Sequence, residues 1–236
     1  MIEIKNIEMQ FNKKVILNDF NLQIEKGDFL GILGTNGGVG GKTTLLKIIM
    51  GGMIVPNKGT IIINGEVQHI TNYSLQNNMG FVPDHAILYE YLTGEEYLHF
   101  VGGMFKVSNE RIKKFTETVL KDMGLIDVKD KLIKTYSHGM KQKVSIASSL
   151  IHEPKFLLLD EPLTGVDLIS GKNIRNFLKQ YTENGNTVII TTHLLELAHS
   201  ICNKIAIIHK GKLAKIINVT DYDLEKLEKE VESIYV

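Results

Sequence analysis

A glycine-rich loop followed by a lysine and two threonines is the stretch of this sequence with the clearest chemical potential. An apolar run over 29–33 leads into the loop, and apolar residues at helical spacing follow it over 45–49. The loop contains Gly34, Gly37, Gly38, Gly40 and Gly41, and the polar residues after it are Lys42, Thr43 and Thr44. Backbone N–H groups turn inward around an anion most easily where residues lack a Cβ, and a helix N-terminus favours negative charge. The order strand, glycine loop, helix therefore predicts a phosphate-binding loop, in which Lys42 contacts the β- and γ-phosphates and the Thr43 hydroxyl binds magnesium.

The spacing of this loop departs from the usual pattern. That pattern has a glycine five residues before Gly41, and Asn36 stands there instead. Compared with the common form Gly-x-Asn-Gly-x-Gly-Lys-Thr-Thr, the segment Gly38-Val39-Gly40 takes the place of one residue, which makes the loop two residues too long. One interpretation is a bulge at 38–40 that leaves the anion site intact, with the helix beginning near Gly41. The other is a lesion that weakens phosphate binding.

A pair of acids closes a continuous apolar run later in the chain. Asp160 and Glu161 directly follow this run, which is typical of a strand buried on both faces. Ligands of open α/β sheets bind at the carboxyl ends of such strands. Asp160 is expected to hold magnesium through water, and Glu161 to polarise the water that attacks the γ-phosphate. Taken alone, the two acids would be interpreted as capping a strand near a turn, but the glycine loop upstream favours the catalytic interpretation.

The first part of the chain has mainly the periodicity of strands. Residues 1–26 predict two strands with a turn between them, and 56–65 predict a turn, a strand and the hairpin signal Asn-Gly. A short strand is expected over 79–83. The period then becomes helical, and residues 87–152 contain no convincing strand.

The second part of the chain alternates strands with helices. Strands are expected over 155–160, 187–191 and 205–209, and helices over 170–183 and 194–202. This order predicts a parallel sheet with right-handed crossovers. Residues 221–235 form a charged amphipathic pattern, interpreted as a terminal helix packed on its own domain, with a partner or dimer contact as the alternative.

These patterns together predict an α/β fold. We expect a P-loop NTPase core with a parallel sheet, an N-terminal antiparallel β subdomain and an inserted α-helical subdomain. Within a single domain, the core and the β subdomain are expected at 1–86 and 153–215, the helical subdomain at 87–152 and a C-terminal helix at 216–236.

Composition argues against several classes of protein. Lys plus Arg and Asp plus Glu number 27 each, so no broad basic surface and no nucleic-acid partner are expected. The single cysteine, Cys202, excludes an internal disulfide and is compatible with a reducing cytoplasm. Residues 1–5 alternate like a strand rather than a signal peptide, and no apolar run reaches the roughly 20 residues needed to cross a bilayer. We therefore expect a soluble protein whose role at a membrane would need a partner.

Between the glycine loop and the acid pair lies the segment Tyr136-Ser137-His138-Gly139-Met140, just before a predicted helix. With this segment the chain resembles the ATP-binding cassette (ABC) family from Ile2 to about Lys215. The family's signature, Leu-Ser-Gly-Gly-Gln, occupies the same place and matches only at Ser137 and Gly139. The resemblance implies that the signature of one cassette completes the ATP site of another in a head-to-tail dimer, where Ser137 and Gly139 would face a γ-phosphate.

Four other positions follow in the order of the family. The resemblance implies that Phe11 stacks on adenine, although a phenylalanine that ends a strand is by itself more typical of a core. Asp84 stands where the family has a glutamine that contacts magnesium and responds to the membrane subunit. Asp167 would face the dimer partner, and His193 would sense the γ-phosphate. The spacing of His193 with Glu196 and His199 also permits a metal site, but no metal-site signature accompanies it.

The predicted site residues fall into three groups. The catalytic candidates are Glu161, His193 and Lys42. The nucleotide-binding candidates are Phe11, Asn36, Gly37, Gly38, Gly40, Gly41, Lys42, Thr43, Thr44, Ser137, Gly139 and Asp167. The magnesium candidates are Thr43, Asp84 and Asp160.

The resemblance implies an ATPase that uses ATP and Mg²⁺, pairs with a second cassette and drives a separate membrane permease from the cytoplasmic face of the cell membrane. Ser-x-Gly-Met-Lys-Gln resembles the variant of bacterial export systems, so export is the expected direction. One alternative is a soluble switch in translation or DNA repair, but those proteins usually carry two cassettes, or long coiled-coil or zinc inserts. The other alternative is a structural cassette that binds nucleotide poorly because of its longer loop.

Overall fold

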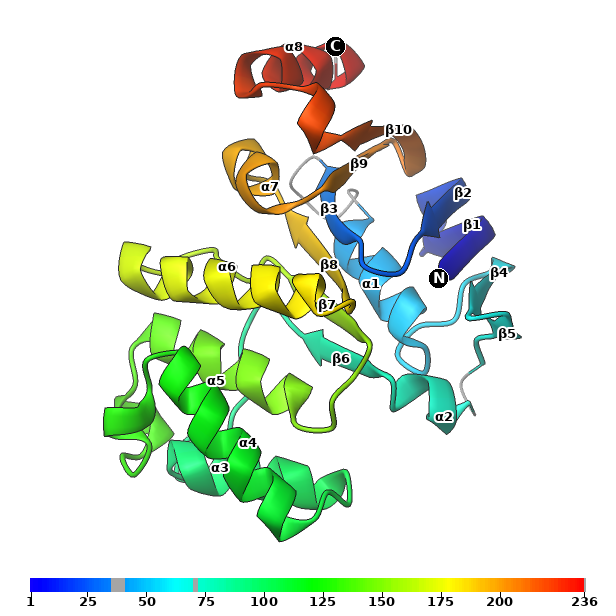
Figure 1. The fold of residues 1–236 in the computed structure, drawn as a ribbon. Coiled ribbons are helices and arrows are strands. Elements are labelled where there is room, and N and C mark those ends of the chain that lie inside the picture. Colours follow the sequence, from blue (N-terminus) through cyan, green and yellow to red (C-terminus); the bar gives the residue numbers. More distant parts are fainter. Residues whose placement is uncertain (35–40, 70–71, 236) are drawn as a thin grey trace.

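Two β-sheets with helices packed around them make up the fold (Figure 1). The structure is a computed structural model that describes residues 1–34, 41–69 and 72–235. The smaller sheet is antiparallel, has the order β2-β1-β4-β5, and comprises β1 (Ile2–Phe11), β2 (Lys14–Ile24), β4 (Lys58–Ile63) and β5 (Glu66–Val67). The larger sheet has six strands in the order β10-β9-β3-β8-β7-β6. Its strands are β3 (Phe29–Gly34), β6 (Met79–Val82), β7 (Phe156–Asp160), β8 (Thr187–Thr192), β9 (Lys204–His209) and β10 (Lys212–Asn218).

The interior of the larger sheet is parallel and fully buried. Every residue of β3, β7 and β8 is buried, as their unbroken apolar runs predict. Leu157 and Leu159 face a core shared with the helical part, whereas Phe156 and Leu158 face a core shared with the antiparallel sheet. The sheet is therefore covered on both faces, and the carboxyl ends of β3, β7 and β8 meet at one edge.

Eight α-helices lie in the described part of the chain. They are α1 (Lys42–Met50), α2 (Tyr73–Gln76), α3 (Gly94–Met104), α4 (Asn109–Asp122), α5 (His138–Leu150), α6 (Leu168–Glu183), α7 (Leu195–Ile201) and α8 (Leu224–Tyr235). Figure 1 shows α3, α4 and α5, in green, gathered at the opposite end of the molecule from α8. None of the helices among the described residues has the length and apolar character needed to cross a bilayer.

The expected fold class is confirmed, with a correction near the C-terminus. Residues 87–152 form α3, α4 and α5 without a strand, apart from one isolated bridge between Thr93 and Leu132. The boundary at 215/216 is wrong because it cuts β10, and the last helix begins only at Leu224. This strand lies at the edge of the sheet, its pairing with β9 is irregular between Leu213 and Lys215, and its apolar residues do not alternate along the sequence. The short helix α2 was not predicted.

Candidate functional site

Lys42 begins helix α1 directly after Gly41, a position where only glycine fits. Gly41 has a φ of 69°, and a Cβ there would lie 2.8 Å from the side chain of Leu17. The helix therefore begins where the sequence predicted. Lys42 is only 8% exposed, and its Nζ donates a hydrogen bond to the carbonyl oxygen of Gly34 at 2.9 Å. A cation is thus held between the end of β3 and the start of α1, at a helix end that favours anions.

Asp160 and Thr191 connect the ends of two adjacent strands. Asp160 closes β7 and is 1% exposed, and Thr191 lies beside it on β8. The Thr191 hydroxyl donates a hydrogen bond to Asp160 Oδ1 at 2.5 Å. The parallel pairing of β7 and β8 therefore fixes the carboxylate of Asp160 at the edge where the strands end.

Glu161 has an unusual backbone conformation immediately after β7. Its φ is 46°, in the left-handed region that side chains rarely adopt. The backbone N–H of Glu161 donates to the hydroxyl of Thr191 at 3.0 Å and lies 3.2 Å from the Thr191 carbonyl oxygen. Such strain persists only where surrounding contacts hold it, and residues of this kind cluster at active sites.

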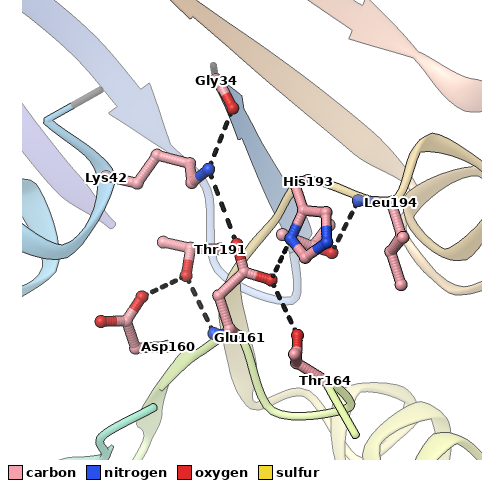
Figure 2. A network of polar contacts seen from close by, with 9 residues as sticks. Gly34, Lys42, Asp160, Glu161, Thr164, Thr191, His193 and Leu194 are labelled. Atoms are coloured by element: carbon pink, nitrogen blue, oxygen red, sulfur yellow. Dashed lines mark hydrogen bonds and ion pairs between the residues drawn. The ribbon is translucent and has the colours of Figure 1, made fainter. Parts of the chain in front are cut away.

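The side chain of Glu161 is the centre of a polar network (Figure 2). Its Oε1 lies 3.6 Å from Lys42 Nζ, which forms an ion pair. Its Oε2 accepts hydrogen bonds from the Thr164 hydroxyl at 3.2 Å and from His193 Nδ1 at 3.0 Å. Because a carboxylate only accepts, His193 carries its proton on Nδ1 in this arrangement. One acid thus joins Lys42 and His193, which are far from it in the sequence, to Thr164 in its own turn.

Phe11, Thr43 and Asp84 lie outside this network. Phe11 ends β1 and is 45% exposed, whereas Thr43 is exposed in the first turn of α1, followed by the partly exposed Thr44. Asp84 is exposed after β6, and its carboxylate accepts a hydrogen bond from the backbone N–H of His85 at 3.0 Å. Asn36, Gly37, Gly38, Gly40 and the predicted bulge lie outside the described residues.

Ser137 and Asp167 cap two adjacent helices rather than contacting Lys42. The Ser137 hydroxyl accepts from the N–H of Met140 at 3.3 Å, and Asp167 Oδ1 accepts from the N–H of Ser170 at 2.9 Å. The hydrogen bonds that Ser170 donates hold the pKa of Asp167 below its usual value. Both capping side chains are exposed. The signature segment therefore forms the start of α5 and lies beside the start of α6.

Thr164 and Thr191 are the two members of the network that were absent from the predicted site. Thr191 ends the strand predicted over 187–191, and Thr164 lies between the predicted site residues Glu161 and Asp167. A signal existed in each case, because a buried carboxylate needs donors and a hydroxyl at a neighbouring strand end or turn can supply one.

The alternative reading of two histidines as metal ligands finds no matching geometry. His199 Nε2 donates to the carbonyl oxygen of Tyr222 at 2.9 Å, whereas His193 faces Glu161. Among the residues that the structure describes, no group of three metal-ligating side chains of His, Cys, Asp or Glu is present.

Comparisons with known proteins agree with one another. Residues 17–164 match the protein family described as "ABC transporter". The chain is 36% identical to the linearmycin resistance ATP-binding protein LnrL of Bacillus subtilis over 94% of its length and 70% of the relative. It is 34% identical to the bacitracin transport ATP-binding protein BcrA of Enterococcus faecalis, again over 94% of its length and 70% of the relative.

A solved structure extends the comparison to the fold. It is a dimeric post-hydrolysis state of the ATP-binding cassette MJ0796 bound to ADP and phosphate. Its TM-score is 0.81 at 26% identity, with coverage of 93% of this chain and 99% of the other. The similarity spans both sheets and the helical part.

Proposed function

The chain belongs to the ABC transporter family as an ATP-binding, ATP-hydrolysing cassette, and from this premise we propose that Glu161 is the general base of its ATPase reaction. The observation that carries the proposal is the convergence of Lys42, Thr164 and His193 on one strained carboxylate. General bases must be held within hydrogen-bond reach of the proton that they accept. Lys42 and His193 supply this restraint from two distant segments, and Thr164 supplies it from the turn that follows Glu161.

The two carboxylate oxygens of Glu161 have different roles in this proposal. Oε2 already accepts two hydrogen bonds, from Thr164 and His193, which occupies both of its in-plane lone pairs. Oε1 faces Lys42 at 3.6 Å, which is longer than a hydrogen bond. Oε1 is therefore the atom that accepts a proton from the attacking water, while Oε2 fixes the orientation of the carboxylate.

Lys42 and the start of α1 bind the phosphates. The ammonium group has three N–H donors and gives one to Gly34, so donors remain for the β- and γ-phosphates. Helix α1 has no acidic residue in its first turn, and its N-cap residue, Gly41, has no side chain that could cap it. Its first N–H groups and its dipole are therefore free to act on an anion.

A magnesium site fits the chemistry of the side chains at this edge. Asp160 and Thr43 supply a carboxylate and a hydroxyl, and Asp84 supplies a further carboxylate from the end of β6. Hard divalent cations prefer such oxygen ligands. When bound, magnesium would neutralise charge on the phosphates. Of the three candidates, Asp160 is buried and held by Thr191, whereas Thr43 and Asp84 are exposed.

The proposed partners are a second cassette and a membrane permease, and they are supported by the family and by exposed side chains. We propose a head-to-tail pairing of two cassettes, in which the exposed Ser137 and Asp167 face the other subunit and the buried Gly139 lets the start of α5 pack on the start of α6. The pair would drive a membrane permease from the cytoplasmic face. Export is supported by the names of LnrL and BcrA, a resistance protein and a bacitracin transport protein.

Substitution of the base tests this assignment. For Glu161→Gln we expect ATP hydrolysis to fall by roughly 10²- to 10⁴-fold, because the amide cannot accept the proton of water. Nucleotide affinity should remain, since the amide oxygen can still accept the bonds from Thr164 and His193. Glu110→Gln, an exposed acid in the first turn of α4, is the control and should hydrolyse ATP like the wild type. Wild-type turnover by Glu161→Gln in the presence of ATP and magnesium would overturn the assignment.

A further inference from the structure

His138 occupies a position where the signature pattern has a glycine. It is the first residue of α5, between the cap Ser137 and Gly139, and its side chain is exposed. A side chain at this point can reach a neighbouring loop that a glycine cannot touch. The proposed function so far leaves this histidine without a role.

The ring of His138 contacts the loop that follows Glu161. Its Nε2 lies 3.2 Å from the carbonyl oxygen of Thr164. A carbonyl oxygen only accepts, so Nε2 carries the proton and donates it to this bond. The next residue, Gly165, has a φ of 70°, and a Cβ there would lie 3.6 Å from Nε2. The ring therefore packs closely against this turn.

Thr164, which accepts a hydrogen bond from His138, also contacts the proposed base, Glu161. Its hydroxyl donates to Glu161 Oε2 at 3.2 Å, and its backbone N–H donates to the carbonyl oxygen of Glu161 at 3.2 Å. One residue therefore accepts from His138 and donates to Glu161. The path from the signature helix to the catalytic carboxylate contains only two side-chain hydrogen bonds.

The start of α5 packs closely against the start of α6, which follows the loop containing Thr164. A Cβ on Gly139 would lie 2.9 Å from the Cβ of Ser170 and 2.9 Å from Asp167 Oδ2, so the helix backbone packs directly on the start of α6. Gly139 is buried, in contrast to the exposed His138. The backbone that carries His138 is therefore held in place by α6. If α5 shifts, the His138 ring moves with it and displaces the Thr164 carbonyl.

We propose that His138 is a positioning residue that couples the signature segment to the catalytic carboxylate of the same chain. This inference rests on the proposed function, in which the signature acts on the partner's nucleotide and Glu161 on the chain's own. His138 then links the two sites of the dimer. When the signature binds the partner's nucleotide, the position of Glu161 beside the chain's own nucleotide changes. The link consists of His138, Thr164 and Glu161.

Two substitutions of His138 test the link on the full-length chain with ATP and magnesium. His138→Ala removes the donor, and we expect kcat to fall about fivefold, the effect of one hydrogen bond, with a reduced Hill coefficient for ATP. KM should change little, since His138 does not contact the chain's own nucleotide. In His138→Gln the side-chain amide can donate to the same carbonyl, so kcat and the Hill coefficient should recover. His69→Ala, an exposed histidine beyond β5, is the matched control.

The link through Thr164 has its own test. In a Thr164→Val background the bond to Glu161 is already lost, so His138→Ala should lower kcat little further. Wild-type kcat and Hill coefficient in His138→Ala, failure of His138→Gln to recover them, or fully additive losses in the double variant would each overturn the proposal. If Glu161→Gln loses hydrolysis while any of these results is found, the role of His138 is refuted and Glu161 remains the proposed general base. Wild-type hydrolysis in Glu161→Gln would instead remove the base on which the link acts.

Discussion

Thr191 places one hydroxyl between the two acids of the site. It donates to Asp160 Oδ1 at 2.5 Å and accepts from the N–H of Glu161 at 3.0 Å. The donor capacity of a hydroxyl is thus used for one acid and its acceptor capacity for the other. Because Thr191 is completely buried, water cannot replace either bond. The geometry of both acids therefore depends on a residue that need not contact nucleotide.

Replacement of Thr191 by valine separates this hydroxyl from the volume of the side chain. We expect Thr191→Val to lower the free energy of unfolding by about 1–3 kcal/mol, because Asp160 loses a buried donor and the Glu161 N–H loses one of its two acceptors. Hydrolysis should fall more than ATP affinity, since Glu161 is then less restrained. Thr191→Ser keeps the hydroxyl and serves as the control. Urea denaturation and steady-state ATPase assays measure the two effects, and a valine variant equal to the serine variant in both would contradict this role.

At the scale of elements, the helix N-termini differ according to what they face. Helix α3 begins with a complete capping box, in which Thr93 Oγ1 accepts from the N–H of Glu96 and the Glu96 carboxylate accepts from the N–H of Thr93. Helix α1 begins at Lys42, and its N-cap residue, Gly41, has no side chain to serve as a cap. A structural helix thus satisfies its own first N–H groups, whereas the helix at the proposed phosphate site leaves them to a ligand.

The capping box of α3 allows a prediction about stability without catalysis. Thr93→Ala should lower the free energy of unfolding by about 1 kcal/mol, because one N–H at the helix start loses its acceptor. Thr93→Ser should remain close to the wild type. Chemical denaturation monitored by circular dichroism measures the difference. The capping role would be refuted by an alanine variant as stable as the serine variant.

At the scale of the whole molecule, His152 joins the helical part to the larger sheet. It follows α5, its Nε2 donates to the carbonyl oxygen of Met79 in β6 at 3.0 Å, and its ring stacks on Phe105 with centroids 3.9 Å apart. Within the described residues its Nδ1 is buried without a hydrogen-bond partner. Burial lowers the pKa of His152, and the bond to Met79 offsets this only in part.

Acid should therefore weaken this junction. Because the folded protein keeps His152 neutral, the unfolded chain binds more protons as the pH falls below the ordinary histidine value of 6.5. The free energy of unfolding then decreases until the pH is also below the lowered pKa of the folded state. His152→Gln keeps a donor for Met79 but does not titrate, so it should lose less stability than the wild type between pH 7.5 and about 5.5. Parallel losses in urea denaturation of the two proteins would show that His152 is not responsible.

The sequence by itself determined the order of the elements and the residues at their ends. Strand and helix periodicity are local properties, so they predicted the parallel strands, the helical insert and the start of α1 at Gly41. The placement of Lys42 after β3 and of Asp160 after β7 also follows, because parallel strands end at a common edge. The short helix α2 and the edge strand β10 were missed, and β10 is an irregular, half-exposed strand without a clear pattern.

The tertiary structure decided which groups meet at that edge. The left-handed turn at Glu161 and the register of β7 against β8 bring Thr191 to both acids. The packing of α5 on α6 brings His138 to Thr164. Contacts of this kind depend on long-range register and on side-chain direction, which local periodicity does not encode. For this reason the start of α1 and the acid pair at the end of β7 were predictable, whereas the contacts of Thr164, Thr191 and His138 around Glu161 became visible only in the fold.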